Sequence, residues 1–142
     1  MNNKPILEYE DIYNNYKYCV VFQPHGFRCG YVEIPVWHKM YKQHYDFIPV
    51  KCHGGLTYAE DYLLDKKENS WWIGFDCCHY DDLPDIESMK KYYYNEEHYD
   101  DNNFLKCYKT LFDATSKLSS IKTLDFCTNE CKNIIDQLNN LP

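Results

Sequence analysis

The amino-acid sequence predicts an α+β fold, in which a twisted, mainly antiparallel sheet is covered by C-terminal helices. Short apolar runs, rich in β-branched and aromatic residues and separated by Gly and Pro, fill the first eighty residues. After residue 80 the composition changes to Asp, Asn, Lys and Tyr, and the last twenty residues carry apolar side chains at helical spacing. A chain of 142 residues can bury one substantial core, so we expect a single domain over residues 1–142, with the sheet in about 18–80 and the helices in about 85–141.

The first eighty residues divide into predicted strands at their Gly and Pro residues. The run CVVFQ after Tyr18, a turn PHGF at 24–27 and the run CGYVEIPV at 29–36 predict a β-hairpin. Pro35 then begins a short predicted helix, VWHKMYKQ, and FIPVKC at 47–52 predicts an edge or irregular strand because it contains Pro49. A tight turn with two glycines follows at 53–58, then a charged loop DKKENS at 65–70, and then WWIGFDC at 71–77, the strongest strand signal in the chain.

Three helices are expected after residue 80. They cover about 86–94, about 104–112 and the C-terminal end. Thr123 is placed as the N-cap of the last helix, and Asp125 lies in its first turn, where a carboxylate interacts favourably with the helix dipole. The apolar stripe of that helix, which we expect to pack on the sheet, consists of Leu124, Cys127, Cys131, Ile134, Ile135 and Leu138.

The charge balance restricts the partners of the protein. Lys and Arg total 15 against 22 Asp and Glu, which gives a net charge of -7, and no basic stripe is evident that would bind an extended nucleic acid. Neither a basic start followed by an apolar run nor a stretch of eighteen apolar residues occurs, so we expect a cytoplasmic protein without a membrane partner. In that reducing compartment the 8 cysteines are expected to be free thiols that pack as small hydrophobic side chains.

The stretch WWIGFDCCHYDD at 71–82 carries the densest group of chemically useful side chains. Alternation along a strand places Trp72, Gly74 and Asp76 on one face. A flat ring fits over the glycine if it stacks on the indole of Trp72 and donates hydrogen bonds to Asp76. In the alternative interpretation, Gly74 accommodates a side chain from a neighbouring strand and Trp72 belongs to the core.

Two further segments have residues that are suited to holding an anion. In HGGLTY, Gly54 and Gly55 allow consecutive N–H groups to face a phosphate. His53 adds a further donor and Thr57 a hydroxyl. In PHGFRCGY, Arg28 is the only arginine of the chain and is suited to a bidentate pair with a phosphate or carboxylate. The alternatives are an ordinary tight turn for the first segment and an exposed, unpaired arginine for the second.

Enzyme chemistry has weaker support in the sequence. A hydrolase needs a general base oriented by a carboxylate, and the candidate residues are His53, His79, Asp76 and Asp82. Cys77 beside His79 could form a thiolate–imidazolium pair, but no third orienting residue is evident. A zinc ion would draw on Cys52, His53, Cys77, Cys78 and His79, yet no C-x-x-C pair occurs, so the sequence predicts neither a metal nor another cofactor.

Taken together, four segments resemble a family of small bacteriophage and prophage proteins, most of them of unknown function. The segments are FRCGYVEIP, HGGLTY, WWIGFDCCH and the closing TLDFCTNECKNIIDQL, and the resemblance covers about the first eighty and the last twenty residues. The positions that match the family pattern are Cys29, Gly30, Tyr31, His53, Gly54, Gly55, Leu56, Thr57, Tyr58, Trp71, Trp72, Gly74, Phe75, Asp76, Cys77, His79 and Asp82. Cys78 and Asp81 depart from the pattern, in which a small residue and a glycine are usual.

The resemblance implies a phage accessory protein that counters bacterial defence. We expect it to bind and sequester a nucleotide-derived immune signal, a cyclic nucleotide or an ADP-ribose derivative, in the host bacterial cytoplasm and as a homo-oligomer. The expected ligand-binding residues are Arg28, His53, Gly54, Gly55, Thr57, Trp72, Gly74, Asp76 and His79. A hydrolase that degrades such a nucleotide is one alternative, and the other is an inhibitor whose acidic stretch at 80–103 covers a basic surface of a host protein.

Overall fold

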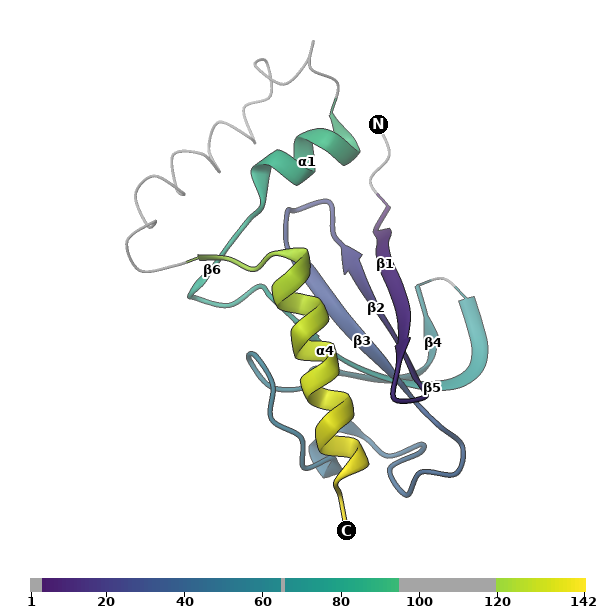
Figure 1. The fold of residues 1–142 in the computed structure, drawn as a ribbon. Helices are drawn as coiled ribbons and strands as arrows, with labels where there is room; N and C mark the ends of the chain where they lie inside the picture. Colours follow the sequence, from purple (N-terminus) through teal and green to yellow (C-terminus); the bar gives the residue numbers. More distant parts are fainter. Residues whose placement is uncertain (1–3, 65, 95–119) are drawn as a thin grey trace.

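The computed structural model describes residues 4–64, 66–94 and 120–142, and its main feature is a five-stranded sheet (Figure 1). The strands are β1 (Ile6–Tyr13), β2 (Tyr16–Phe22), β3 (Arg28–Ile34), β4 (Tyr58–Leu63) and β5 (Lys66–Asp76). They lie in the order β1-β2-β3-β5-β4, and every neighbouring pair is antiparallel. The predicted α+β class and the predicted hairpin of β2 and β3 are therefore confirmed.

The C-terminal helix α4 (Leu124–Asn139) lies across one face of this sheet (Figure 1). Its N-cap is Thr123, as predicted, and the hydroxyl of this residue accepts the Phe126 N–H at 3.1 Å. The buried stripe of α4, which consists of Cys127, Cys131, Ile134, Ile135 and Leu138, belongs to the same apolar cluster as Tyr18, Val20, Val32, Ile34, Ile73 and Phe75 of the sheet. Burying one such aliphatic side chain contributes about 1.5–3 kcal/mol, so this contact between helix and sheet is the main apolar core of the described residues.

The opposite face of the sheet carries a smaller apolar cluster made of strand residues. Cys19 pairs with Tyr31, and Tyr31 pairs with Gly74, so these positions share the face that α4 does not cover. The buried members of this cluster are Cys19, Val21, Leu63 and Trp72, with Tyr31 and Tyr58 packed beside them. Curvature of the sheet encloses these side chains: β5 bends along its length (Figure 1), and the pairings of β1 and β4 each contain a register shift.

A shorter helix, α1 (Ile86–Tyr93), packs at the end of β2. Its N-cap is Asp85, and its buried side chains Met89 and Tyr93 contact the last residue of that strand. The helix predicted at 86–94 is therefore confirmed. Its position closes the end of the sheet where β2 turns into β3 (Figure 1).

The sheet begins earlier in the sequence than predicted. β1 starts at Ile6 and not near residue 18, because ILEYEDIY is a largely exposed edge strand that mixes apolar and charged residues without clean alternation. The loop predicted at 65–70 is also wrong for residues 66–70, since β5 starts at Lys66; residue 65 lies outside the described residues. Lys66 pairs with Leu63, so hairpin pairing extends the strand into the charged run.

The connection between β3 and β4 contains neither the helix nor the strand predicted for it. Residues 35–43 form successive turns, and a single 3-10 turn follows at Tyr45–Phe47. Near the predicted strand 47–52, the Lys51 N–H donates to the side chain of Gln137 at 2.8 Å, and the Lys51 carbonyl accepts from the same side chain at 2.7 Å. Hydrogen bonds to α4 thus replace the strand pairing that Pro49 disfavours. The helix predicted at 104–112 lies outside the described residues.

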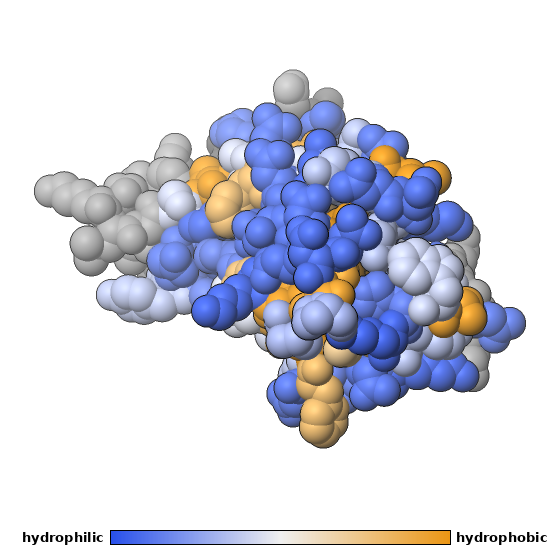
Figure 2. Space-filling view, turned by 60° about the horizontal axis from the view of Figure 1, so that its bottom comes forward, coloured by the Kyte–Doolittle hydropathy of each residue, from blue (hydrophilic) through white to orange (hydrophobic). Residues whose placement is uncertain are grey.

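Hydrophobic residues form separate small patches among hydrophilic ones on the face shown in Figure 2. This pattern fits a chain whose large apolar side chains gather in the clusters on the two faces of the sheet. Within the described ranges, no helix is long and apolar enough to cross a membrane.

Candidate functional site

The structure brings the HGGLTY turn and the end of the WWIGFDCCH strand together. Tyr58 pairs with Gly74 of β5, and the Thr57 N–H donates to the Gly74 carbonyl at 2.9 Å. This pairing sets the turn beside Asp76 and the loop that follows it. We call the resulting group the His–Asp site, and it consists of His53, Thr57, Asp76, His79, Asp82 and Lys122.

Asp82 is the centre of the closed half of this site. Its carboxylate is 0% exposed, and its two oxygens lie 2.8 and 2.9 Å from Nε2 of His53. The ammonium of Lys122, which lies between β7 (Ser120–Ile121) and α4, is 3.0 Å from the same carboxylate, and the His79 N–H donates to it at 2.9 Å. Burial alone would raise the pKa of Asp82, but hydrogen bonds from the His53 ring, a backbone N–H and the lysine lower it below its ordinary value. The group is therefore held as a carboxylate at neutral pH.

Asp76 and His79 form the open half of the site. Each side chain is 32% exposed, and Nε2 of His79 lies 3.3 Å from the Asp76 carboxylate and 3.0 Å from the Asp76 backbone carbonyl. The carboxylate also accepts the Thr57 hydroxyl at 2.9 Å and the Cys78 N–H at 3.1 Å. These neighbours fix the orientation of Asp76 while leaving part of the carboxylate open to solvent.

The two glycines of the turn have different roles in this geometry. Gly54, with a φ of 68°, and Gly55, with a φ of 80°, both take the left-handed conformation that the sequence predicts. The His79 imidazole lies directly on Gly54, since a Cβ added there would be 2.0 Å from Nε2 of the ring. Gly55 borders open space, but its N–H donates to the Cys52 carbonyl at 2.9 Å. The expectation that consecutive N–H groups of this turn face an anion is therefore wrong.

Both histidines of the site direct Nε2 toward a carboxylate. A neutral imidazole that donates from Nε2 carries its lone pair on Nδ1, where it acts as an acceptor or a base. The His53 and His79 rings lie edge to face with centroids 5.5 Å apart, and the His53 ring is 5.3 Å from that of Phe126 in α4. The open half of the site presents the Asp76 carboxylate as an acceptor, so it can bind hydroxyl and amino groups.

This arrangement gives little support to metal binding or to thiol chemistry. Among the described residues, His53, Asp81 and Asp82 offer ligand atoms within 4.8 Å of one another, but the Lys122 ammonium already lies 3.0 Å from Asp82. The sulfur atoms of Cys77 and Cys127 are 3.6 Å apart in the buried core. The hydrogen bond between the thiols, together with burial, raises the pKa of Cys77, so Cys77 is not an activated nucleophile beside His79.

Two residues of the predicted ligand-binding strand are used for packing. Trp72 is 5% exposed and belongs to the apolar cluster on the second face of the sheet. Gly74 accommodates the Tyr31 ring, whose nearest carbon would be 2.5 Å from an added Cβ. The predicted alternation of Trp72, Gly74 and Asp76 holds, but the gap expected over the glycine is filled by a side chain of β3, so no flat ligand ring fits there.

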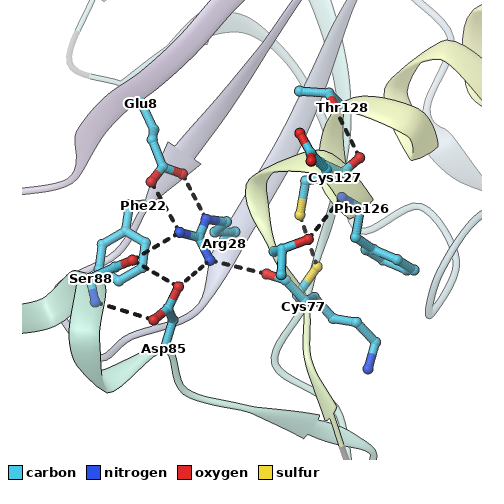
Figure 3. A network of polar contacts seen from close by, with 12 residues as sticks. Glu8, Phe22, Arg28, Cys77, Asp85, Ser88, Phe126, Cys127 and Thr128 are labelled. Carbon is cyan, nitrogen blue, oxygen red and sulfur yellow. Dashed lines mark hydrogen bonds and ion pairs between the residues drawn. The ribbon is translucent and has the colours of Figure 1, made fainter.

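Arg28, predicted to contact an anionic ligand, is buried and bonded to groups of this chain (Figure 3). Its guanidinium donates to both oxygens of Glu8 at 2.6 and 3.0 Å and lies 4.9 Å from the centre of the Phe22 ring. Its other acceptors are Asp85, Ser88 and the Lys122 carbonyl, at 2.9, 3.1 and 3.1 Å. The bidentate carboxylate partner that the sequence suggested is therefore internal, and an external phosphate would have to displace it.

Sequence reasoning missed three residues around the His–Asp site, namely Lys122, Phe126 and Glu130. The Glu130 carboxylate accepts the His53 N–H at 2.8 Å and so anchors the turn to α4. Lys122 directly precedes the N-cap of α4, and Phe126 and Glu130 lie in the first half of the helix. Their residue types carry no signal for this role, because the packing of α4 brings Phe126 and Glu130 to His53, and the pairing of Asp82 with Ser120 brings Lys122 to Asp82.

Comparison with known proteins does not identify a family. No protein-family model matches the chain, and no curated protein or solved structure gives a significant match to it. The resemblance to phage proteins therefore stays a prediction, and the functional inference rests on the geometry of the site and on the motifs.

Proposed function

We propose that the protein binds a small nucleotide-derived molecule at the His–Asp site and sequesters it without turnover. The observation that supports this most directly is the open pair of Asp76 and His79. Both side chains are about one-third exposed, and the Thr57 hydroxyl and a backbone N–H fix the carboxylate. Fixed polar groups at the end of a strand favour binding, because little side-chain freedom is lost when the ligand arrives.

The hydrogen-bonding pattern favours the sugar and the base of such a ligand over its phosphates. The Asp76 carboxylate, which is about one-third exposed, accepts hydrogen bonds. The Gly55 N–H is engaged within the turn and Arg28 is bonded to Glu8, so neither group serves as a donor to an anion. Ribose hydroxyls and exocyclic amino groups are donors that match the site. An ADP-ribose derivative, with two riboses, matches it better than a cyclic nucleotide.

The biological setting of the proposal comes from the motifs that resemble phage proteins. A phage protein that captures an immune signal in the host cytoplasm needs affinity and abundance but no catalytic step. Self-association is part of the proposal, since a pocket shared between two copies of the chain covers a ligand more completely than one open site.

A hydrolase is the second candidate, and the contact between His53 and Asp82 favours it. A buried carboxylate bonded to one imidazole nitrogen fixes the tautomer and leaves the other nitrogen as a base. In that mechanism His53 would activate water and Asp82 would be a positioning residue. The acidic-inhibitor alternative depends partly on residues 95–103, which lie outside the described residues.

Filtration followed by chromatography separates these two candidates. The purified protein is incubated with cyclic nucleotides and ADP-ribose derivatives and then removed by filtration. The filtrate is analysed before and after heat denaturation of the retained protein. Sequestration predicts a compound that disappears and returns unchanged, whereas hydrolysis predicts new peaks. A panel in which nothing is depleted and nothing is converted contradicts both candidates.

Variants connect the outcome to the site. Asp76→Asn keeps the shape of the side chain but removes its charge, and it should weaken retention at least about tenfold, because a hydrogen bond to a charged group contributes about 1.5–3 kcal/mol. His53→Gln should abolish any conversion if the protein is a hydrolase. His44→Ala is the matched control, since this histidine is 50% exposed and bonded to Asp46 outside the site, and it should change neither retention nor conversion.

A further inference from the structure

Two cysteine side chains meet in the core beside the His–Asp site. Cys77 directly follows β5, and Cys127 lies in the first turn of α4. Their sulfur atoms are 3.6 Å apart and point toward each other (Figure 3). Both residues belong to the main apolar cluster and are 1% and 0% exposed. The fold thus holds two thiols in contact although they are 50 residues apart in the sequence.

The backbone on each side of this pair is fixed. The Cys77 N–H donates to the Arg28 carbonyl of β3 at 2.9 Å, and the Cys127 N–H donates to the Thr123 carbonyl at 3.1 Å. A disulfide has a sulfur–sulfur distance of about 2.05 Å, so the two sulfur atoms need to approach by about 1.5 Å. Small rotations of the two side chains can supply this movement, and the contact between the thiols makes their effective concentration high.

We infer that Cys77 and Cys127 form a redox-sensitive dithiol that a peroxide converts to an intramolecular disulfide. The pair is not a catalytic nucleophile, and the reaction changes only the protein and the oxidant. It does not depend on the function proposed for the His–Asp site.

The reaction has two steps that balance. The Cys127 thiolate attacks one oxygen of hydrogen peroxide, the O–O bond breaks, and the departing hydroxide takes up the proton that the thiol had lost and becomes water. The Cys77 sulfur then attacks the resulting sulfenic acid, the S–O bond breaks as the S–S bond forms, and the hydroxyl group leaves with the Cys77 proton as a second water. The two sulfur atoms lose two electrons, and the peroxide accepts them.

The position of Cys127 gives the oxidant its route to the pair. Helix ends open more readily than helix centres, and opening the first turn of α4 exposes Cys127 to a small oxidant. The hydrogen bond to Cys127 and burial raise the pKa of Cys77, so Cys77 is suited to the second step and not to the first. The N-cap at Thr123 therefore controls the rate of oxidation, because it keeps this turn closed.

The disulfide would join two segments that carry different parts of the His–Asp site. His79 lies two residues after Cys77, and Cys127 follows Phe126, whose ring centre is 5.3 Å from that of His53. The bond would also close a long loop in the unfolded chain and so stabilise the folded, oxidised protein.

Peptide mapping without reduction tests the inference in the full chain. Reduced protein is treated with a small excess of hydrogen peroxide, remaining thiols are blocked with N-ethylmaleimide in urea, and tryptic peptides are analysed by mass spectrometry. The wild type should give a species that joins the Cys77 peptide to the Cys127 peptide with the loss of two hydrogen atoms, and dithiothreitol should separate them. In urea denaturation, oxidation should lower the unfolding equilibrium constant at least about tenfold.

Variants identify the two sulfur atoms of the bond. Cys127→Ala should give no linked species. Cys78→Ser and Cys131→Ala are the matched controls, because each removes the second cysteine of one of the two peptides. Cys78 is exposed, and the Cys131 sulfur donates to the Cys19 carbonyl at 3.8 Å, so the linked species should persist in both controls.

Three results would overturn the inference. The first is the absence of a linked species at a peroxide excess that oxidises the exposed Cys78. The second is a link that disappears in Cys78→Ser or Cys131→Ala. The third is an unchanged rate in Thr123→Ala, since the lost N-cap should speed formation of the disulfide about fivefold if the first turn of α4 gives access to Cys127.

Discussion

Alanine at Gly54 should perturb the His–Asp site more than alanine at Gly55, and the structure gives the size of the difference. Both residues have a positive φ, so alanine at either position meets a left-handed penalty of about 1–2 kcal/mol. At Gly55 nothing lies within 4 Å of an added Cβ, and that penalty is the whole effect. At Gly54 the new Cβ would fall 2.0 Å from the His79 ring, which must therefore move.

Moving the His79 ring breaks its hydrogen bond to the Asp76 carbonyl, at 3.0 Å in the wild type. This loss adds only about 1 kcal/mol, because the ring is partly exposed and solvent screens the ion pair with the Asp76 carboxylate. Gly54→Ala should lower the free energy of unfolding by about 2–3 kcal/mol, and Gly55→Ala by about 1–2 kcal/mol. Urea denaturation measures both values, and the filtration assay reports the effect on retention. Equal destabilisation, or full retention by Gly54→Ala, would refute the placement of His79 on Gly54.

Three further predictions concern the framework around the site. Arg28→Met should lower the free energy of unfolding by about 3–5 kcal/mol, because Glu8 and Asp85 lose a buried partner, and a loss below about 1 kcal/mol in urea denaturation would contradict the network. Acidification should destabilise the protein. Burial raises the pKa of Asp82 and Asp85, but their hydrogen bonds outweigh it, so folding lowers the pKa of both carboxylates. The unfolded chain therefore binds protons first, and the free energy of unfolding falls as pH drops below about 4. Replacing both residues by Asn should flatten this part of the profile, and an unchanged slope would count against the argument. Thr123→Ala should lower the free energy of unfolding by about 1 kcal/mol because α4 loses its N-cap, whereas the control Thr128→Ala, inside the helix, should change it little. Thermal unfolding distinguishes the two variants, and equal effects would argue against the cap.

The elements that the sequence predicted well are those whose burial follows a simple period. The run at 71–77 and the hairpin partner CVVFQ are almost continuously apolar, and the last helix combines an N-cap at Thr123 with a complete apolar stripe. β1 could not be predicted in the same way because it is an edge strand with several exposed charges. The strand predicted at 47–52 was wrong for a different reason. Its backbone forms hydrogen bonds with the Gln137 side chain, a partner far away in the sequence.

The candidate site was predictable only as far as residue types and local turns carry the argument. The convergence of His53 with Asp76 and His79 follows from pairing the turn with β5, and the positive φ of both glycines follows from their sequence. The sequence does not show which group, a ligand or a side chain of the same chain, contacts a candidate binding residue. Gly74 and Arg28 both have the chemistry that a ligand would need. However, the Tyr31 ring fills the gap over Gly74, and carboxylates of the same chain accept the hydrogen bonds of Arg28. Side chains supplied by other elements decide such cases, and one-dimensional patterns do not record them.

The central claim is that the open carboxylate of the His–Asp site recognises the hydroxyl and amino groups of a nucleotide-derived ligand. Calorimetric titration of ADP-ribose into the wild type, Asp76→Asn and His44→Ala tests it most directly. The account predicts that wild type and His44→Ala bind with equal affinity, and that Asp76→Asn binds at least about tenfold more weakly while its unfolding in urea is little changed. Equal affinity in all three proteins, or no heat of binding in the wild type, would contradict it.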